Sequence, residues 1–245
     1  MTLNPILKAL STLRKYDVPA LLMGGQACIL YGGAEFSRDV DLAVPSSPDG
    51  LAPLRMALAE LQAEAVYVPP LEPAFLEKGH ACHFRCRHPE AGGLRIDVLS
   101  RMRGCSDFPT LWSRRAEFAV PEAGPVAALC LADLVQSKKT QRDKDWPMIR
   151  RLIEADYLNR RENAAPEDVR WWLAEARTPG ILLALAREHP DIAGQVAARP
   201  WLLEPRADED ALAARLDEEE RAVRQADREY WAPLRRELEA LRRAR

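Results

Sequence analysis

The residues best suited to chemistry are two aspartates, Asp39 and Asp41, which stand one residue apart in a short apolar segment. Successive side chains of a β-strand point to opposite faces, so both carboxylates should share one face while Val40 and Leu42 point into the core. Two carboxylates on one face repel each other unless a positive charge lies between them. Mg²⁺ is suited to that position because it binds carboxylate oxygens together with phosphate oxygens. The pair therefore predicts a divalent-metal site.

A glycine pair, Gly24 and Gly25, precedes the aspartates and ends the apolar run 20–23. Glycine has no Cβ, so its backbone can approach a phosphate closely, and the free N–H groups at the start of a following helix can bind that phosphate. Ser37 stands two residues before Asp39, where its hydroxyl could orient the carboxylate or a phosphate, or satisfy a turn. Together these residues indicate metal-assisted phosphoryl or nucleotidyl transfer.

This order of motifs resembles the nucleotidyltransferase superfamily, which has the fold of polymerase-beta-like enzymes. The family signature is an apolar residue, glycine, glycine or serine, a spacer of roughly ten residues, and Asp-apolar-Asp/Glu-apolar. Here the signature reads MGG at 23–25, a spacer over 26–38, and DVDL at 39–42. The family has a third carboxylate on a later strand, and Asp97 supplies it within LRIDVL at 94–99.

The resemblance implies an enzyme that moves a nucleoside monophosphate from an NTP to an acceptor and releases pyrophosphate. Asp39 and Asp41 would hold Mg²⁺ (or Mn²⁺) against the triphosphate, and Asp97 would complete the second metal site and help to deprotonate the acceptor. Gly24 and Gly25 would bind phosphate through their backbone N–H groups. The acceptor, whether RNA, protein or a small molecule, is not named by the sequence.

A second informative stretch covers residues 131–145. Lys138 and Arg142 are four residues apart, so on a helix over 126–141 both cations would share one face, set up for a phosphate chain. The stretch resembles the Lys…Arg-x-Lys-Asp segment of the AbiEii-like, toxin- and antitoxin-associated branch of nucleotidyltransferases. The resemblance implies that Lys138, or else Lys139, contacts the nucleotide phosphates. The charge pattern alone favours a solvated helix.

Two other classes of function stay open. One is a catalytically silent binding or regulatory protein that kept the fold, although such a protein has no need of clustered carboxylates at a phosphate site. The other is a toxin-like enzyme that acts on tRNA or protein and is paired with an antitoxin partner. A zinc site at His80, Cys82, Cys86 and His88 is disfavoured, because alternate strand residues are over ~6 Å apart along the chain. The thiols are better explained as buried small side chains.

Composition narrows the class of protein further. The chain has 245 residues, a formal net charge of −2 and a pI near 6.2, so no overall basic field points to nucleic acid. The five cysteines are odd in number and scattered, and residues 1–5 lack the features of a signal peptide. No apolar run approaches the roughly twenty residues of a membrane span. We therefore expect a cytoplasmic protein with reduced thiols that does not enter the membrane.

The elements that must position these residues give an α+β fold. We expect a small mixed nucleotidyltransferase sheet flanked by helices over 1–125, followed by a helical C-terminal region over 126–245. The expected elements are a helix over 3–17, a strand over 20–23, a helix over 26–31, a strand over 38–44, a helix over 51–61 and a hairpin of 81–87 with 94–99. Residues 208–245 have the charge spacing of solvated helix, with a break or kink between two helices expected at Pro233.

Overall fold

The computed structural model describes residues 4–34, 36–204 and 208–244. These residues form two compact units. The first unit draws on residues 1–30, 34–137 and 229–245, and the second on residues 31–33 and 138–228. The first unit holds the sheet and all three aspartates of the sequence motifs, so it contains the candidate site.

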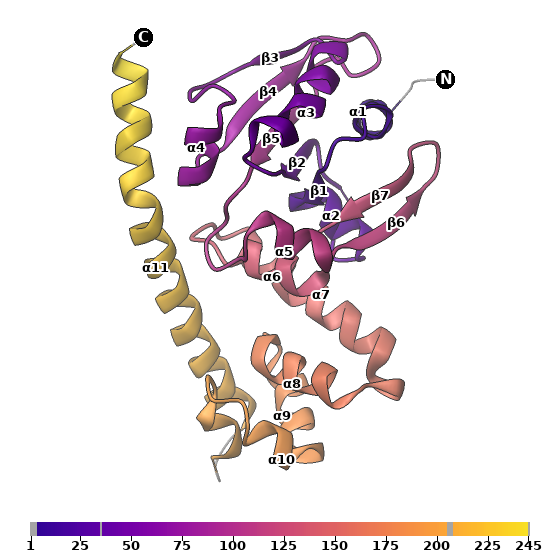
Figure 1. Ribbon diagram of the computed structural model, residues 1–245. Coiled ribbons are helices and arrows are strands. Elements are labelled where there is room, and N and C mark those ends of the chain that lie inside the picture. Colours follow the sequence, from indigo (N-terminus) through magenta and orange to yellow (C-terminus); the bar gives the residue numbers. More distant parts are fainter. Residues whose placement is uncertain (1–3, 35, 205–207, 245) are drawn as a thin grey trace. The chain divides into compact units, whose positions relative to one another are not determined.

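The first unit is built on a seven-stranded mixed sheet with the order β3-β4-β5-β2-β1-β7-β6 (Figure 1). The strands are β1 Leu21–Met23, β2 Asp39–Ala43, β3 Ala63–Ala65, β4 Cys82–Cys86, β5 Arg95–Leu99, β6 Ala116–Val120 and β7 Gly124–Ala128. The central strand β2 runs parallel to β5 and antiparallel to β1. β4–β5 and β6–β7 are antiparallel pairs, and β1 is parallel to β7. The mixed sheet confirms the α+β class predicted from the sequence.

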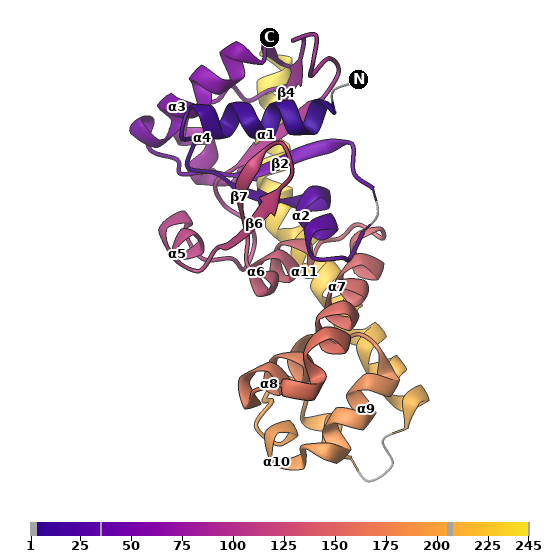
Figure 2. The same cartoon turned by 90° about the vertical axis from the view of Figure 1, so that its right-hand side faces the viewer.

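Six helices of 4–138 flank this sheet within the described part of the chain. They are α1 Pro5–Lys15, α2 Gly24–Leu30, α3 Pro48–Glu60, α4 Pro73–Lys78, α5 Phe108–Ser113 and α6 Leu131–Lys138. At the start of α1 the Asn4 side chain accepts a hydrogen bond from the Ile6 N–H. At the start of α3 the Ser47 side chain accepts one from the Gly50 N–H. Figure 2 shows α1 beside α3, and Glu60 at the end of α3 forms ion pairs with Lys8 and Lys15.

Two strand pairs of the first unit differ from the sequence-based expectation. The strands expected over 20–23 and 38–44 and the hairpin of 81–87 with 94–99 are present as β1, β2 and β4–β5. The hairpin β6–β7 and the short edge strand β3 were not expected. Because β7 pairs with β1 through Ala128 and Leu22, the first unit continues past the boundary placed at residue 125.

The second unit consists of helices. They are α7 Asp145–Arg160, α8 Pro166–Glu175, α9 Pro179–Glu188, α10 Pro190–Ala193, the 3₁₀ turns Arg161–Asn163 and Pro200–Leu203, and the first part of α11 Glu209–Arg243. Trp172 is fully buried in this unit, and its indole N–H donates to Asp156 at 2.8 Å. Residues 138–228 are thus helical, whereas the region expected to be helical, 126–245, also contains the end of β7 and residues 229–245, which belong to the first unit.

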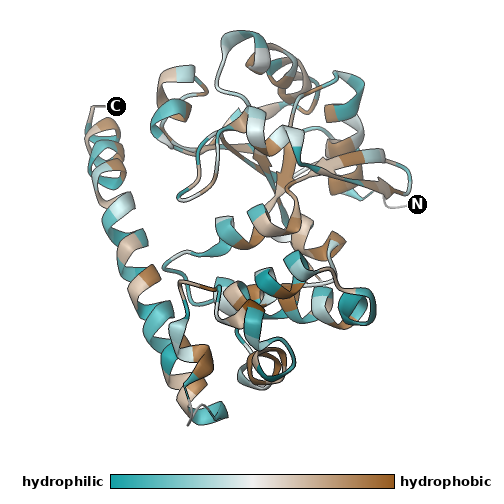
Figure 3. Ribbon diagram, turned by 60° about the horizontal axis from the view of Figure 1, so that its bottom comes forward, coloured by the Kyte–Doolittle hydropathy of each residue, from teal (hydrophilic) through white to brown (hydrophobic). Residues whose placement is uncertain are grey.

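The last helix, α11, is continuous over 35 residues and includes Pro233, so the two separate helices expected on either side of this proline are one helix. Figure 3 shows that hydrophilic residues dominate this helix. Beyond the proline it is held by Glu237, whose carboxylate lies 2.6 Å from Lys78 Nζ and 3.0 Å from His80 Nε2. Within 4–34, 36–204 and 208–244, no helix combines the length and the apolar character needed to cross a membrane.

Candidate active site

The three aspartates of the sequence motifs lie on one face of the two central parallel strands. Asp41 of β2 is the register partner of Asp97 of β5, and Asp39 lies two residues before Asp41 on the same strand. Val40 and Leu42 alternate with these aspartates and are 0% and 1% exposed. Because side chains of paired residues point to the same face, the strands bring Asp41 and Asp97 side by side with Asp39 next to them. This is the arrangement that the strand pattern predicted.

Asp97 is held by two neighbours that the sequence motifs did not single out. Arg95 Nε donates to Asp97 Oδ1 at 2.7 Å, and His83 Nδ1 lies 2.8 Å from the same oxygen. Burial acts to raise the pKa of Asp97, but the hydrogen bonds from His83 and Arg95 outweigh it, and the pKa is lowered. Asp97 is therefore ionised and fixed in direction at neutral pH.

Arg95 carries the positive charge of this site. Its side chain is 35% exposed, and its second contact is with His83 Nδ1, 3.1 Å from Nη2. The hydrogen bond to Asp97 raises the pKa of Arg95, and the charges of Asp97, Asp39 and Asp41 raise it further. The guanidinium thus lies within the field of all three carboxylates.

The two glycines pack closely against this site. Gly24 has a φ of +64°, and a Cβ on it would lie 2.5 Å from Cγ of Asp41. A Cβ on Gly25 would lie 2.7 Å from Cβ of Ser37. Both distances are shorter than any real carbon contact, so side chains at these positions would displace Asp41 and Ser37. The glycines therefore leave room for the site, a role separate from the predicted phosphate binding.

Ser37 fixes the chain just before β2. Its hydroxyl donates to the backbone oxygen of Asp39 at 3.3 Å, and its own backbone oxygen accepts a hydrogen bond from Gln26 Nε2 at 3.0 Å. Of the two roles left open by the sequence, the observed contact is the turn. Gln26 is 9% exposed and lies on α2, so the helix that follows the glycines also holds the start of the carboxylate strand.

Lys138 and Arg142 do not share a helix face, so the predicted helix over 126–141 is wrong. α6 ends at Lys138, and Arg142 lies in the turn before α7. Both cations instead contact Asp145, which is 1% exposed: Lys138 Nζ is 3.4 Å from Oδ1 and Arg142 Nε is 2.7 Å from Oδ2. Thr140 also donates to Asp145 Oδ2, at 2.6 Å. This cluster bends the chain where the sequence predicted a continuing helix.

The two lysines considered for phosphate both have acidic partners in the second unit. Lys138 is 7% exposed, and its neighbour Lys139 lies 2.7 Å from a carboxylate oxygen of Glu175. A buried lysine that neutralises a buried aspartate is in the first place a structural residue. Its contact with a nucleotide remains a prediction.

The metal expected at the carboxylates can be tested against the donor set. In the described ranges, no group of three or more His, Cys, Asp or Glu residues is arranged to hold a metal ion as it stands. Asp39 and Asp41 offer the hard oxygens that Mg²⁺ and Mn²⁺ prefer, and Gly24 keeps side-chain carbon away from Asp41. Asp97 offers the same hard oxygens, but its Oδ1 is in contact with both Arg95 and His83.

The cysteines of β4 lie on the other face of the sheet from His83. Cys82 and Cys86 are 1% and 2% exposed and are free thiols. Burial raises the pKa of Cys82 to about 12 and that of Cys86 to about 11, so both are protonated at neutral pH. This confirms that they are buried small side chains.

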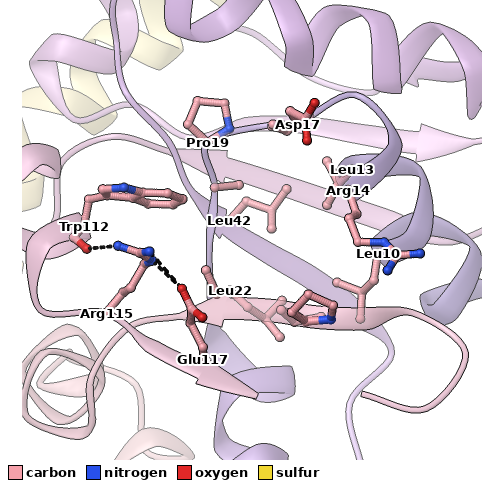
Figure 4. Close-up of a pocket in the computed structure, with 15 residues that line it drawn as sticks. Leu10, Leu13, Arg14, Asp17, Pro19, Leu22, Leu42, Trp112, Arg115 and Glu117 are labelled. Carbon is pink, nitrogen blue, oxygen red and sulfur yellow. Dashed lines mark hydrogen bonds and ion pairs between the residues drawn. The ribbon is translucent and has the colours of Figure 1, made fainter. Parts of the chain in front are cut away.

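A cavity of about 450 Å³ lies on the face of the sheet opposite the carboxylates (Figure 4). Leu22 and Leu42 contribute to its lining, and Leu42 points away from the face that carries Asp41. Arg115 lies over the Trp112 ring, 4.4 Å from its centroid, and is held by Glu117. The sheet separates this cavity from the aspartates, so it is not part of their site.

Arg95 could have been found from the sequence, but His83 could not. Closing the expected hairpin evenly about the loop 88–93 pairs 87 with 94 and puts residue 83 opposite Val98, whereas the observed register puts His83 opposite Asp97. Arg95 lies two residues before Asp97 and so shares its face.

In comparisons with protein-family models and with curated proteins, this chain has no match, so any function must be argued from the geometry of the carboxylate site.

Proposed function

We propose that this protein is a Mg²⁺-dependent nucleotidyltransferase, which moves a nucleoside monophosphate from an NTP to an acceptor with release of pyrophosphate. The observation that supports the proposal best is the pairing of β2 with β5, which puts Asp41 beside Asp97 on the face that carries Asp39. Three partly exposed carboxylates next to a close-packed glycine backbone suit metal-assisted phosphoryl chemistry.

Each residue of the site has a defined part in this proposal. Asp39 and Asp41 would hold the metal, which when bound neutralises the charge of the triphosphate and of the leaving pyrophosphate. Asp97 would orient the acceptor hydroxyl and take its proton. His83 holds Asp97 in place through the 2.8 Å contact. Gly24 keeps the backbone against Asp41, so the carboxylate has a fixed position.

A catalytically silent binding protein is the second candidate, and one observation favours it. Arg95 already neutralises part of the negative charge at Asp97, and a protein that only binds a ligand can use such a pair without metal. The two candidates differ in whether a covalent product forms. A toxin-like enzyme would share the chemistry of the first and differ only in its acceptor, tRNA or protein.

Calorimetry with NTP and Mg²⁺ tests the proposal. The variants Asp39→Asn and Asp41→Asn should weaken metal-dependent binding, because each removes one negative ligand and keeps the shape of the side chain. Asp49→Asn is the matched control, since Asp49 is an exposed aspartate in the first turn of α3. Equal binding in the wild type and both site variants, with and without Mg²⁺, would refute the proposed site.

Product formation separates the enzyme from the silent protein. The wild type is incubated with cell extract, Mg²⁺ and an NTP labelled on its α-phosphate, and label is sought in RNA, protein and small molecules. Asp97→Asn should lose turnover far more than NTP binding, because Asp97 acts on the acceptor side. Metal-dependent binding with no label transferred would favour the silent protein instead.

A further inference from the structure

Arg95 stands where a cation is needed in the carboxylate group. It is the register partner of Asp39 on the neighbouring strand, and its guanidinium donates to Asp97 Oδ1 at 2.7 Å. Asp97, 14% exposed, is fixed by this bond and by His83. The positive charge therefore sits on the same face as Asp39 and Asp41, at the oxygen that a metal would need from Asp97.

A guanidinium at this position opposes a divalent cation in two ways. It occupies Asp97 Oδ1, so a metal that uses this oxygen must first displace it. It also carries a fixed positive charge a few ångströms from the carboxylates, and like charges at short distance in a partly buried site repel strongly. Arginine stays protonated over the whole working range of pH, so this opposition does not depend on pH.

We propose that Arg95 is a built-in counter-ion of the carboxylate group, which competes with the divalent cation for Asp97. Asp39 and Asp41 then take the metal first, and Asp97 joins only after the guanidinium has moved away. The inference rests on the proposed function, because it presumes that a metal binds at these aspartates. It goes further in naming a residue of the chain itself that limits how tightly that metal is held.

The test is the affinity for Mn²⁺ alone, measured by calorimetry without nucleotide. Arg95→Gln should bind Mn²⁺ about tenfold more tightly than the wild type, the size of one charge-assisted hydrogen bond in a half-exposed site. Arg85→Gln is the matched control. Arg85 is the exposed register partner of Arg95 on β4, so this variant removes the same charge from the same face of the sheet.

The variants Asp97→Asn and Arg95→Gln/Asp97→Asn complete a double-mutant cycle, which measures whether the two residues act on Mn²⁺ binding through each other. If Arg95 acts through Asp97, the gain from Arg95→Gln should vanish when Asp97 is already neutral. A similar gain in Arg85→Gln, or a gain that persists without the Asp97 charge, would show a general field effect and overturn the inference. Arg95→Lys serves if the glutamine variant does not fold: a lysine keeps the charge without the planar fork, so a smaller gain is expected.

The failure of this inference is distinct from that of the proposed function. If Mn²⁺ binding by the wild type does not weaken in Asp39→Asn or Asp41→Asn, the metal site itself is refuted, and the inference with it. If binding does depend on these aspartates but Arg95→Gln leaves it unchanged or weaker, only the role of Arg95 is refuted.

Discussion

Replacing Gly24 by alanine tests whether the glycine motif shapes the carboxylate site. An alanine at φ +64° is in the left-handed region, which costs roughly 1–2 kcal/mol for a residue with a Cβ. Its Cβ would also lie 2.5 Å from Cγ and 2.7 Å from Cβ of Asp41, so Asp41 must move. Overpacking of this kind costs about 1–3 kcal/mol, and the two effects together about 2–5 kcal/mol.

Gly93→Ala is the matched control for this change. Gly93 has a φ of +80°, and a Cβ there would meet no atom within 4 Å, so only the backbone cost of about 1–2 kcal/mol applies. The free energy of unfolding is measured by urea titration, with fluorescence and circular dichroism followed together to check two-state behaviour. Mn²⁺ affinity is measured on the same preparations.

The expected result is a larger loss of stability in Gly24→Ala than in Gly93→Ala, with weaker Mn²⁺ binding in Gly24→Ala only. An equal loss of stability in both variants, with unchanged Mn²⁺ binding, would show that the contact between Gly24 and Asp41 does not shape the site. The comparison therefore separates the steric role of the glycine from its conformational freedom.

Two further predictions concern charged residues away from the carboxylates. Lys138→Ala should lower the free energy of unfolding by about 1–3 kcal/mol, because it removes one partner of the buried Asp145. Lys139→Ala, the control, should lower it less. A loss of NTP turnover at unchanged stability would mean that Lys138 serves the substrate instead. Lys15 and its neighbours lower the pKa of Glu60 from 4.5 to about 2, so the stability from Glu60 is present above pH 4.5 and lost as the pH falls towards 2. As the pH falls over that range, Glu60→Gln should lose less of its free energy of unfolding than the wild type. Identical curves would show that ionisation of Glu60 does not contribute to stability.

The two central strands, β2 and β5, could be predicted because their alternating pattern is visible within a few consecutive residues. Alternation of charged and apolar residues in 39–43 and 95–99 is enough to define which face each side chain takes. The parallel pairing of the two strands is not local, and the expected hairpin of β4 with β5 does not determine it. The expectation that Asp97 completes the carboxylate group came from the family resemblance.

The hairpin β6–β7 and the end of α6 could not be found in the same way. β7 contains Gly124, Pro125 and two alanines, which are all depleted in strands, and Val126 is its one strand-favouring residue. Just beyond the end of α6, the Thr140 hydroxyl donates to Asp145 and the Gln141 N–H donates to Asp227, which lies 86 residues further along the chain. No window of sequence around residue 140 contains that partner.

The position of α11 in the chain has a consequence for how the protein is synthesised. The ribosome delivers all of 138–228 before it delivers 229–243, yet these last residues belong to the first unit. A nascent chain can therefore pair Lys78 and His80 with Glu237 only after all of 138–228 has been synthesised. The unit that carries the aspartates is completed only once the chain of the second unit has been made.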